Sequence, residues 1–119
     1  MDKINVSNER INSELAICLF KEADNFIAYS PALDLSGYGK TEAEARASFN
    51  IVLREYFDYA IHEGTLYQDL KSHGWILKKN EIETPKISML ILKNDELSNI
   101  LDKKDFKKYH EPIRVPAFA

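Results

Sequence analysis

Residues 26–62, FIAYSPALDLSGYGKTEAEARASFNIVLREYFDYAIH, decide the fold that we expect for this chain. The stretch begins as a short aromatic strand, turns near Pro31 and two glycines, and continues as one long amphipathic helix. Thr41 and Glu44 have the spacing of a capping box, in which the Thr41 side chain accepts from the Glu44 N–H and the Glu44 carboxylate accepts from the Thr41 N–H. The sequence therefore predicts a strand, a turn and a helix with a defined start.

An apolar stripe predicts that one face of this helix packs on a sheet. Apolar side chains recur at steps of three and four, and most charged side chains fall away from them. Burying each large side chain contributes on the order of 1.5 to 3 kcal/mol, which is more than the cap adds. Gly64 is expected to end the helix in the left-handed conformation. The stripe consists of Ala45, Phe49, Val52, Tyr56 and Ala60, and it is widened by Leu53 and Phe57.

Short apolar runs before the helix predict the strands of the sheet. Residues 14–21 and 26–30 indicate a β-hairpin, because the polar residues between them suit a turn. Residues 33–38 are expected to form a third strand of a sheet whose second face is wet. Residues 1–12 read as a loose polar lead.

The chain beyond the helix predicts a short helix and a returning strand. Thr65 and Gln68 repeat the capping-box spacing, so a second helix is expected to run to about His73 and to end at Gly74. Residues 75–77 form a compact apolar run, which we interpret as a strand that returns to the sheet.

The last third of the sequence has weaker signals. Residues 87–92 fit either an edge strand or the start of a helix, and we interpret them as a strand. Asn94 or Asp95 is expected to cap a helix. Residues 112–119 contain two prolines and are expected to be an extended apolar tail, buried on the chain itself, on a second copy or in a partner. The capped helix would carry Leu97, Ile100 and Leu101, and a further turn from Asp102 would point Phe106 and Tyr109 inward.

These elements predict an α+β fold with the order β-β-β-α-α-β. A three- to four-stranded antiparallel-type sheet packs on one long helix, and a short strand and helix extension follows. We divide the chain into a sheet-and-helix domain, residues 1–80, and a C-terminal extension, residues 81–119, which packs on the same domain or on a partner subunit.

Composition and charge favour a globular protein that meets a basic partner. The chain has 119 residues, 45% hydrophobic and 29% charged, with a net charge of −3. Residues 102–119 carry five basic and three acidic side chains, a balance of +2, which leaves −5 for residues 1–101. No apolar run is long enough for a membrane span, so we expect a cytoplasmic protein without membrane contact. Such a body is a poor surface for nucleic acid and a plausible one for a basic protein.

The sequence offers no constellation that predicts catalysis, a cofactor or a metal. Cys18 lies in an apolar run, which is typical of a buried thiol without chemistry. His62, His73 and His110 are far apart, and we expect structural or surface roles for them. Residues 37–41, GYGKT, lack the full spacing of a phosphate-binding loop, so turn formation explains them. We therefore expect a binding module rather than an enzyme.

The strand-to-helix stretch resembles the HicB-type antitoxins of bacterial toxin–antitoxin pairs. In that family a strand ends near a Cys-Pro or Ser-Pro dipeptide, a short loop leads to a glycine, and a helix starts at a Thr-x-Glu-Glu-Ala-like motif. The matching positions here are Ser30-Pro31, Gly39 and residues 41–45, TEAEA, and the resemblance extends over residues 14–80. It implies a truncated ribonuclease H-like fold.

The resemblance also implies a function and a partner. A HicB-like antitoxin would bind a small basic HicA-type toxin, an mRNA-cleaving enzyme, and cover its active surface, and we expect it to form a homodimer or a higher homo-oligomer. Two alternatives remain: a stand-alone domain of this fold without a toxin, and a DNA-binding autorepressor acting through the C-terminal segment. DNA contact is the less expected, because residues 81–119 fit a ribbon-helix-helix only loosely. The residues that we expect to contact a partner are Tyr29, Asp34, Tyr38, Val115 and Phe118.

Overall fold

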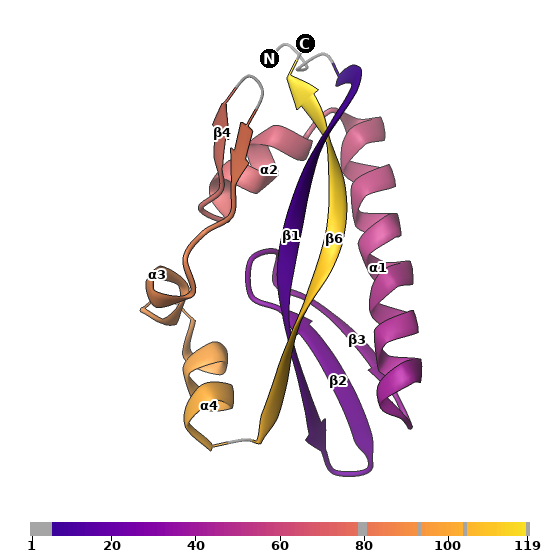
Figure 1. Ribbon diagram of the computed structural model, residues 1–119, viewed down its shortest axis with the longest axis vertical. Coiled ribbons are helices and arrows are strands. Elements are labelled where there is room, and N and C mark those ends of the chain that lie inside the picture. The colour runs from indigo at the N-terminus through magenta and orange to yellow at the C-terminus, as the bar shows by residue number, and fades with distance from the viewer. Residues whose placement is uncertain (1–5, 79–80, 93, 104, 119) are drawn as a thin grey trace.

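A computed structural model shows an elongated α+β chain (Figure 1). It describes residues 6–78, 81–92, 94–103 and 105–118, and of residues 6–9, 96, 103, 117 and 118 it describes the backbone only. The molecule measures 44 × 29 × 24 Å, and its long axis follows two long paired strands (Figure 1). The predicted α+β class, with an antiparallel sheet packed on a long helix, is confirmed.

Four strands form the main antiparallel sheet, in the order β3-β2-β1-β6. The predicted hairpin is present, because β1 ends at Glu22 and turns through Ala23 and Asp24 into β2. The expectation of a loose lead is wrong for residues 6–12, since they extend β1 and pair with the end of the chain; residues 1–5 lie outside the described part. The strands are β1 (Val6–Glu22), β2 (Asn25–Ser30), β3 (Leu35–Gly39) and β6 (Phe106–Phe118).

The long helix α1 (Glu42–Glu63) begins and ends where the sequence predicts. Thr41 is its N-cap and accepts the Glu44 N–H at 3.1 Å, and Gly64 ends it at φ 71°. The second half of the capping box differs, because the Glu44 carboxylate accepts the N–H of Lys40 at 2.9 Å instead of that of Thr41. The carboxylate thus satisfies a donor one residue before the cap.

One face of the sheet and α1 enclose the main hydrophobic core. Leu15, Ile17 and Leu19 alternate along β1 toward α1, where they meet the predicted stripe. The fully or nearly buried members of the stripe are Ala45, Phe49, Leu53 and Ala60, while Val52, Tyr56 and Phe57 are half-buried. The hydrophobic pattern of the sequence therefore located this core correctly.

After α1 the chain forms a short helix and a separate hairpin. The helix α2 (Leu66–Ser72) follows Thr65, whose side chain makes no capping bond, so the predicted second capping box is wrong. Gly74 turns the chain at φ 90°, as expected. The strands β4 (Ile76–Lys78) and β5 (Glu81–Glu83) pair only with each other, so the prediction that residues 75–77 return to the main sheet is wrong.

Two further helices cover part of the second face of the sheet. The run that we interpreted as a strand forms the helix α3 (Ile87–Ile91), and α4 (Asp95–Lys103) follows it. Of the two predicted caps, Asn94 and Asp95, it is Asn94 that caps α4, by accepting the Leu97 N–H at 3.1 Å. This face is therefore not wet throughout, because Leu97 and Ile100 pack on the sheet residues Cys18, Phe20 and Tyr29.

The C-terminal segment returns as β6 along β1. The prediction of a further helical turn from Asp102 is wrong, because β6 begins at Phe106. The Phe106 side chain is partly exposed and does not face inward as expected. Pro112 and Pro116 are accommodated because β6 is an edge strand of the sheet. The predicted extended tail is thus a strand, and its pairing with β1 runs from Phe106 to Phe118. In the view of Figure 1, α1 lies to the right of this β1–β6 ribbon, and α3 and α4 lie to its left.

Candidate functional site

The structure brings two of the expected contact residues together at the end of β2. The Tyr29 hydroxyl donates to the Asp34 carboxylate at 2.8 Å, and Asp34 lies in a tight turn with φ 55°. The Asn94 side-chain amide donates to the same hydroxyl at 2.7 Å, so the cap of α4 is tied to the sheet. Tyr29 is buried in this arrangement, whereas Asp34 is exposed. The cluster therefore ties α4 to the sheet, and Asp34 is its most exposed member.

The other three expected contact residues are separated from one another. The Tyr38 side chain is exposed on β3, on the face opposite the glycines that meet α1. Val115 is fully buried in the chain's own core, so in this structure it presents no surface to a partner. The Phe118 side chain lies outside the described part of the chain. Of the five residues, Asp34 and Tyr38 are thus the two whose side chains are seen to be exposed.

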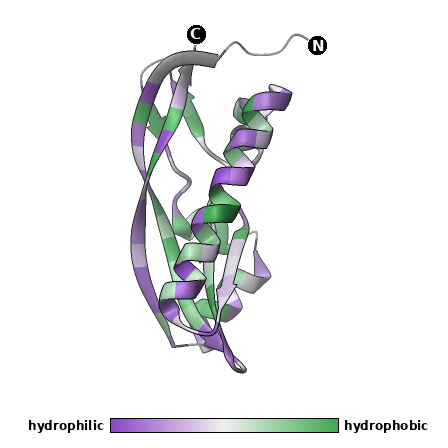
Figure 2. Cartoon of the chain, turned by 90° about the vertical axis from the view of Figure 1, so that its right-hand side faces the viewer, coloured by the Kyte–Doolittle hydropathy of each residue, from purple (hydrophilic) through white to green (hydrophobic). Residues whose placement is uncertain are grey.

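A more extensive exposed surface lies along α1. Residues at steps of three and four place one row of side chains away from the sheet, and we call this row the α1 outer face. It contains two large apolar side chains that are mostly exposed, Ile51 at 60% and the flanking Tyr59 at 69%. Figure 2, in which α1 faces the viewer, shows hydrophilic and hydrophobic stretches following each other along this helix. The members of the α1 outer face are Glu44, Ala47, Ile51, Glu55, Asp58 and His62, with Tyr59 beside them.

The α1 outer face is negatively charged. The helix carries five carboxylates and two arginines, a net charge of −3. Arg46 is engaged on the flank toward the sheet, with its guanidinium 4.1 Å from the ring centre of Tyr109. Arg54 lines a groove between α1 and β6. The acids that remain among the outward side chains are Glu44, Glu55 and Asp58, so the face combines apolar anchors with negative charge.

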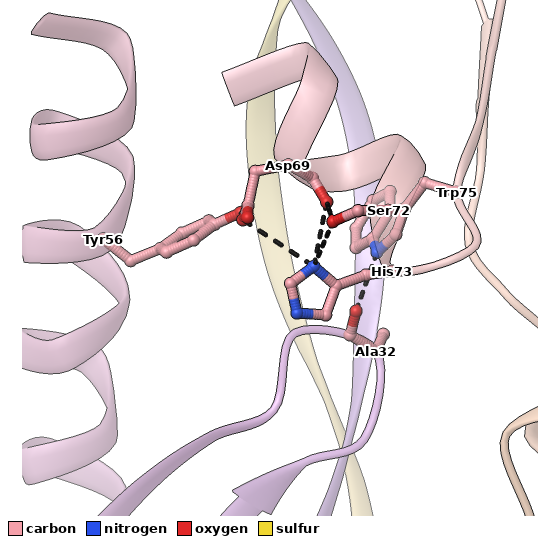
Figure 3. A network of polar contacts seen from close by, with 6 residues as sticks. All are labelled: Ala32, Tyr56, Asp69, Ser72, His73 and Trp75. Atoms are coloured by element: carbon pink, nitrogen blue, oxygen red, sulfur yellow. Dashed lines mark hydrogen bonds and ion pairs between the residues drawn. The ribbon is translucent and has the colours of Figure 1, made fainter. Parts of the chain in front are cut away.

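A polar cluster joins α1 to α2 on the inner side of the helix pair (Figure 3). The Tyr56 hydroxyl donates a short hydrogen bond to the Asp69 carboxylate. The same carboxylate lies 3.7 Å from Nδ1 of His73, one helical turn further on, and that nitrogen is also 2.9 Å from the Asp69 carbonyl oxygen. Ser72 donates to this carbonyl at 2.6 Å. Close by, the Trp75 indole N–H donates to the Ala32 carbonyl at 2.9 Å and ties the chain after α2 to the β2–β3 turn.

Burial raises the pKa of Tyr56 far above its usual value, and the hydrogen bond to Asp69 and the charge of that carboxylate raise the pKa further. A phenol that holds its proton so firmly is a donor at neutral pH and not a base. The cluster is therefore a structural link between α1 and α2, because each of its polar groups interacts with another group of the cluster.

Other candidate chemical groups are found in structural positions. Cys18 is buried, and burial raises the pKa of its thiol, which opposes the reactive thiolate form. Across the ranges that the structure describes, no three His, Cys, Asp or Glu side chains gather in a way that could hold a metal ion. The helices in those ranges include none that is long and apolar enough to cross a membrane. His110 and Glu14 line a hollow of about 520 Å³ between β1, β6, β5 and the chain that follows β5.

The sequence did not predict two features of the structure: the exposed apolar side chains of the α1 outer face, and the polar cluster between α1 and α2. Ile51 and Tyr59 fall outside the buried stripe. They share a helical face with Glu55, and this spacing was the signal in the sequence for an exposed apolar row. Asp69 and His73 stand four residues apart, a spacing that indicates contact on a helix, but their link to Tyr56 depends on how α2 folds back on α1. That fold-back leaves no local signal in the sequence.

Comparisons with protein-family models, with curated proteins and with solved structures each found no match to this chain.

Proposed function

We propose that this chain is a HicB-like antitoxin, which binds and neutralises a small basic mRNA-cleaving toxin of the HicA type. It would act by occupying the toxin's surface, with the α1 outer face as the main contact. The observation that carries this proposal is the pairing of exposed apolar side chains, Ile51 and Tyr59, with the carboxylates of Glu55 and Asp58 on one helical face.

The chemistry of this face suits a basic protein partner. Complementary charge raises the rate at which two proteins meet, and buried apolar anchors lengthen the life of the complex. Large aromatic side chains are common among the residues that contribute most to binding, and Tyr59 is such a residue. The same negative charge would disfavour RNA or DNA on this face, because phosphate backbones are bound by clustered Lys and Arg.

The order of elements around residues 30–45, which carry the family resemblance, supports the proposal. β2 ends at Ser30, the chain turns at Pro31, β3 ends at Gly39, and α1 starts behind Thr41. A HicB-type domain would have this order, and we propose that the sheet and α1 correspond to its truncated ribonuclease H-like arrangement. The exposed Asp34 and Tyr38 would be secondary contacts near the same module.

Co-expression tests the proposal. The chain is produced together with the short, basic, histidine-bearing protein that we expect in a neighbouring reading frame, and both complex formation and rescue of growth are measured. We expect a complex that survives size-exclusion chromatography and restores growth. Absence of both would reject the antitoxin function and would favour a stand-alone domain.

Paired variants locate the contact. The double substitution Ile51→Lys and Tyr59→Lys should abolish the complex, because it replaces both apolar anchors by the charge that the basic partner carries. Ile76→Lys is the matched control, since Ile76 is also an exposed apolar residue, at 53%, but lies on β4. If the control and the double variant bind equally well, the α1 outer face is not the contact.

A further inference from the structure

The hollow of about 520 Å³ lies on the face of the sheet that α1 does not cover. Ala16 of β1 and His110 of β6, which are paired neighbours in the sheet, both line it. Leu15 and Ile17, on either side of Ala16, belong to the core beneath α1, so the alternation of a strand directs the Ala16 side chain to the opposite face. The hollow and the α1 outer face are therefore separated by the sheet.

The wall of the hollow that faces the sheet is held in place at both of its ends. Residues 82–84 and Lys86 form this wall, on the chain that passes beside β1 from β5 to α3 (Figure 1). At one end, Leu77 and Ile82 pack against the main core. At the other end, Ile87 packs against the second cluster, beneath α4. A ligand therefore meets a hollow that is already formed, as in most sites for small molecules.

A small side chain on β1 accounts for the space. Further along the same face of this strand, Cys18 and Phe20 pack in the cluster that α4 covers. Ala16 offers only a methyl group at the position where the hollow begins, and Ile82 is the apolar residue on the opposite wall. Both Ala16 and Ile82 are half-buried, so the hollow has an apolar part between its polar groups.

Opposite charges line the hollow without pairing with each other. Glu14 and Lys86 both line it, and both side chains are exposed. Within the described part of the chain, neither of these two side chains has a hydrogen-bond or ion-pair partner. The other acid of the lining, Glu83, lies 3.6 Å from the Lys78 ammonium and is already paired. One carboxylate and one ammonium group without partners thus border the same space.

We propose that this hollow binds a small zwitterion with an aliphatic side chain, such as a free amino acid or a dipeptide. The ammonium group of the ligand pairs with Glu14, its carboxylate pairs with Lys86, and its aliphatic part lies on Ala16 and Ile82. The His110 imidazole adds a further hydrogen-bonding group. Charge-assisted hydrogen bonds of this kind are stronger than neutral ones, so a ligand without one of the two charges binds less well.

The lining disfavours ligands that carry one sign of charge. An anion meets the Glu14 carboxylate, and a cation meets the Lys86 ammonium group, so each is repelled by one of the two groups and leaves that group unpaired. A volume of about 520 Å³ is within the range of small-molecule sites. A ligand with both charges and an apolar part therefore fits this hollow best.

Nuclear magnetic resonance titration of the full, isotope-labelled chain with L-leucine tests the site. We expect saturable shifts of the backbone signals of Ala16, Thr84 and His110. L-leucinamide, which lacks the carboxylate, and N-acetyl-L-leucine, which lacks the ammonium group, should each bind at least about 10-fold more weakly. Glycyl-L-leucine distinguishes the two sources of the zwitterion: tighter binding than leucine assigns the hollow to a peptide, and equal or weaker binding assigns it to a free amino acid.

Variants of the lining locate the ligand. Ala16→Leu fills the hollow without changing its charge and should abolish the shifts, whereas Ala47→Leu adds the same volume at an exposed residue of α1 and should bind as the natural sequence does. Glu14→Gln and Lys86→Gln should each weaken binding at least about 10-fold. Glu81→Gln is the matched control for charge, because Glu81 is exposed on β5 but does not line the hollow.

Thermal melting of every variant without ligand shows which variants are folded, and the two glutamine variants decide the question if Ala16→Leu does not fold. No saturable shifts with either leucine or glycyl-leucine would overturn the proposal. Equal binding of leucine, leucinamide and N-acetyl-leucine would also overturn it, as would binding that the lining variants leave unchanged. Because the titration contains no toxin, its outcome does not depend on the proposed antitoxin function.

Discussion

Gly37 in β3 and Phe49 in α1 approach so closely that a Cβ atom at position 37 would lie 2.3 Å from the Phe49 backbone nitrogen. Side chains cannot relieve such a contact, because the opposing atoms belong to the helix backbone. β3 is an edge strand, and α1 also bonds to it directly, with the Ser48 hydroxyl accepting the Tyr38 N–H at 3.2 Å. The absence of a side chain at position 37 thus fixes how closely α1 packs on the sheet.

Gly37→Ala should therefore destabilise the fold by about 1 to 3 kcal/mol or more, because α1 must move away from β3. Urea denaturation at neutral pH measures the change. Ser36→Ala on the same strand is the control, and it should change stability by less than about 0.5 kcal/mol. Equal effects of the two substitutions would show that the approach of α1 to β3 is not required.

Phe49→Ala tests the core itself. Phe49 is fully buried at the centre of the apolar stripe of α1, and its truncation should cost about 3 to 5 kcal/mol, the sum of lost burial and the cavity left behind. The same denaturation experiment gives the value. A change of only a few tenths of a kcal/mol would mean that the stripe does not form the core.

Replacing Ser30 or Ser48 by alanine should change the stability of the fold in opposite directions. The Ser30 hydroxyl is buried without a hydrogen-bond partner among the described residues, so Ser30→Ala should raise stability by about 1 kcal/mol. Ser48→Ala removes the acceptor for the Tyr38 N–H and should lower stability by about 0.5 to 1.5 kcal/mol. Melting curves of both variants make the comparison, and a loss of stability in Ser30→Ala would mean that its hydroxyl has a stabilising partner.

The Tyr56–Asp69 hydrogen bond should make the stability of the fold depend on pH in the alkaline range. The folded chain raises the pKa of Tyr56 above its ordinary value of about 10, so above that pH the unfolded chain releases a proton that the folded chain keeps. The unfolded state then binds fewer protons, and stability falls as pH rises, by at most about 1.4 kcal/mol per pH unit for this group.

Tyr56→Phe isolates this contribution. The variant should be about 1 kcal/mol less stable than the natural sequence at pH 7, because Asp69 loses a donor but remains partly exposed to water. Above about pH 10 the difference should shrink, since phenylalanine does not titrate. Urea denaturation at pH 7, 9 and 10.5 gives the three differences, and a constant difference would show that Tyr56 titrates alike in both states.

The parts of the fold that the sequence predicted are those with local causes. Thr41, the periodic stripe of α1 and Gly64 each act through neighbours within one or two helical turns, and the helix was placed correctly from them. The start of α4 was likewise predicted at Asn94 or Asp95, and Asn94 is the cap. The hairpin of β1 and β2 followed from a turn between two apolar runs.

The errors concern partners that are distant in sequence. The polar residues 6–12 become a strand only because β6 pairs with them. A strand forms close to the predicted residues 75–77, at Ile76–Lys78, but its partner is β5 and not the main sheet. The run in α3 is too short for its period to separate a strand from a helix. Val115 was expected to contact a partner, yet the same pairing with β1 buries it within the chain.

The proposed antitoxin function rests on whether the α1 outer face binds a basic protein. We would titrate the purified chain with the co-purified neighbouring toxin by isothermal calorimetry, using the natural sequence and the Ile51→Lys, Tyr59→Lys double variant, and we would follow mRNA cleavage in the same samples. We expect tight binding and inhibition of cleavage by the natural sequence, and loss of both in the folded double variant. Binding and inhibition that are unchanged by the two lysines would contradict the proposed contact, and cleavage that continues with the natural sequence in excess would contradict the function.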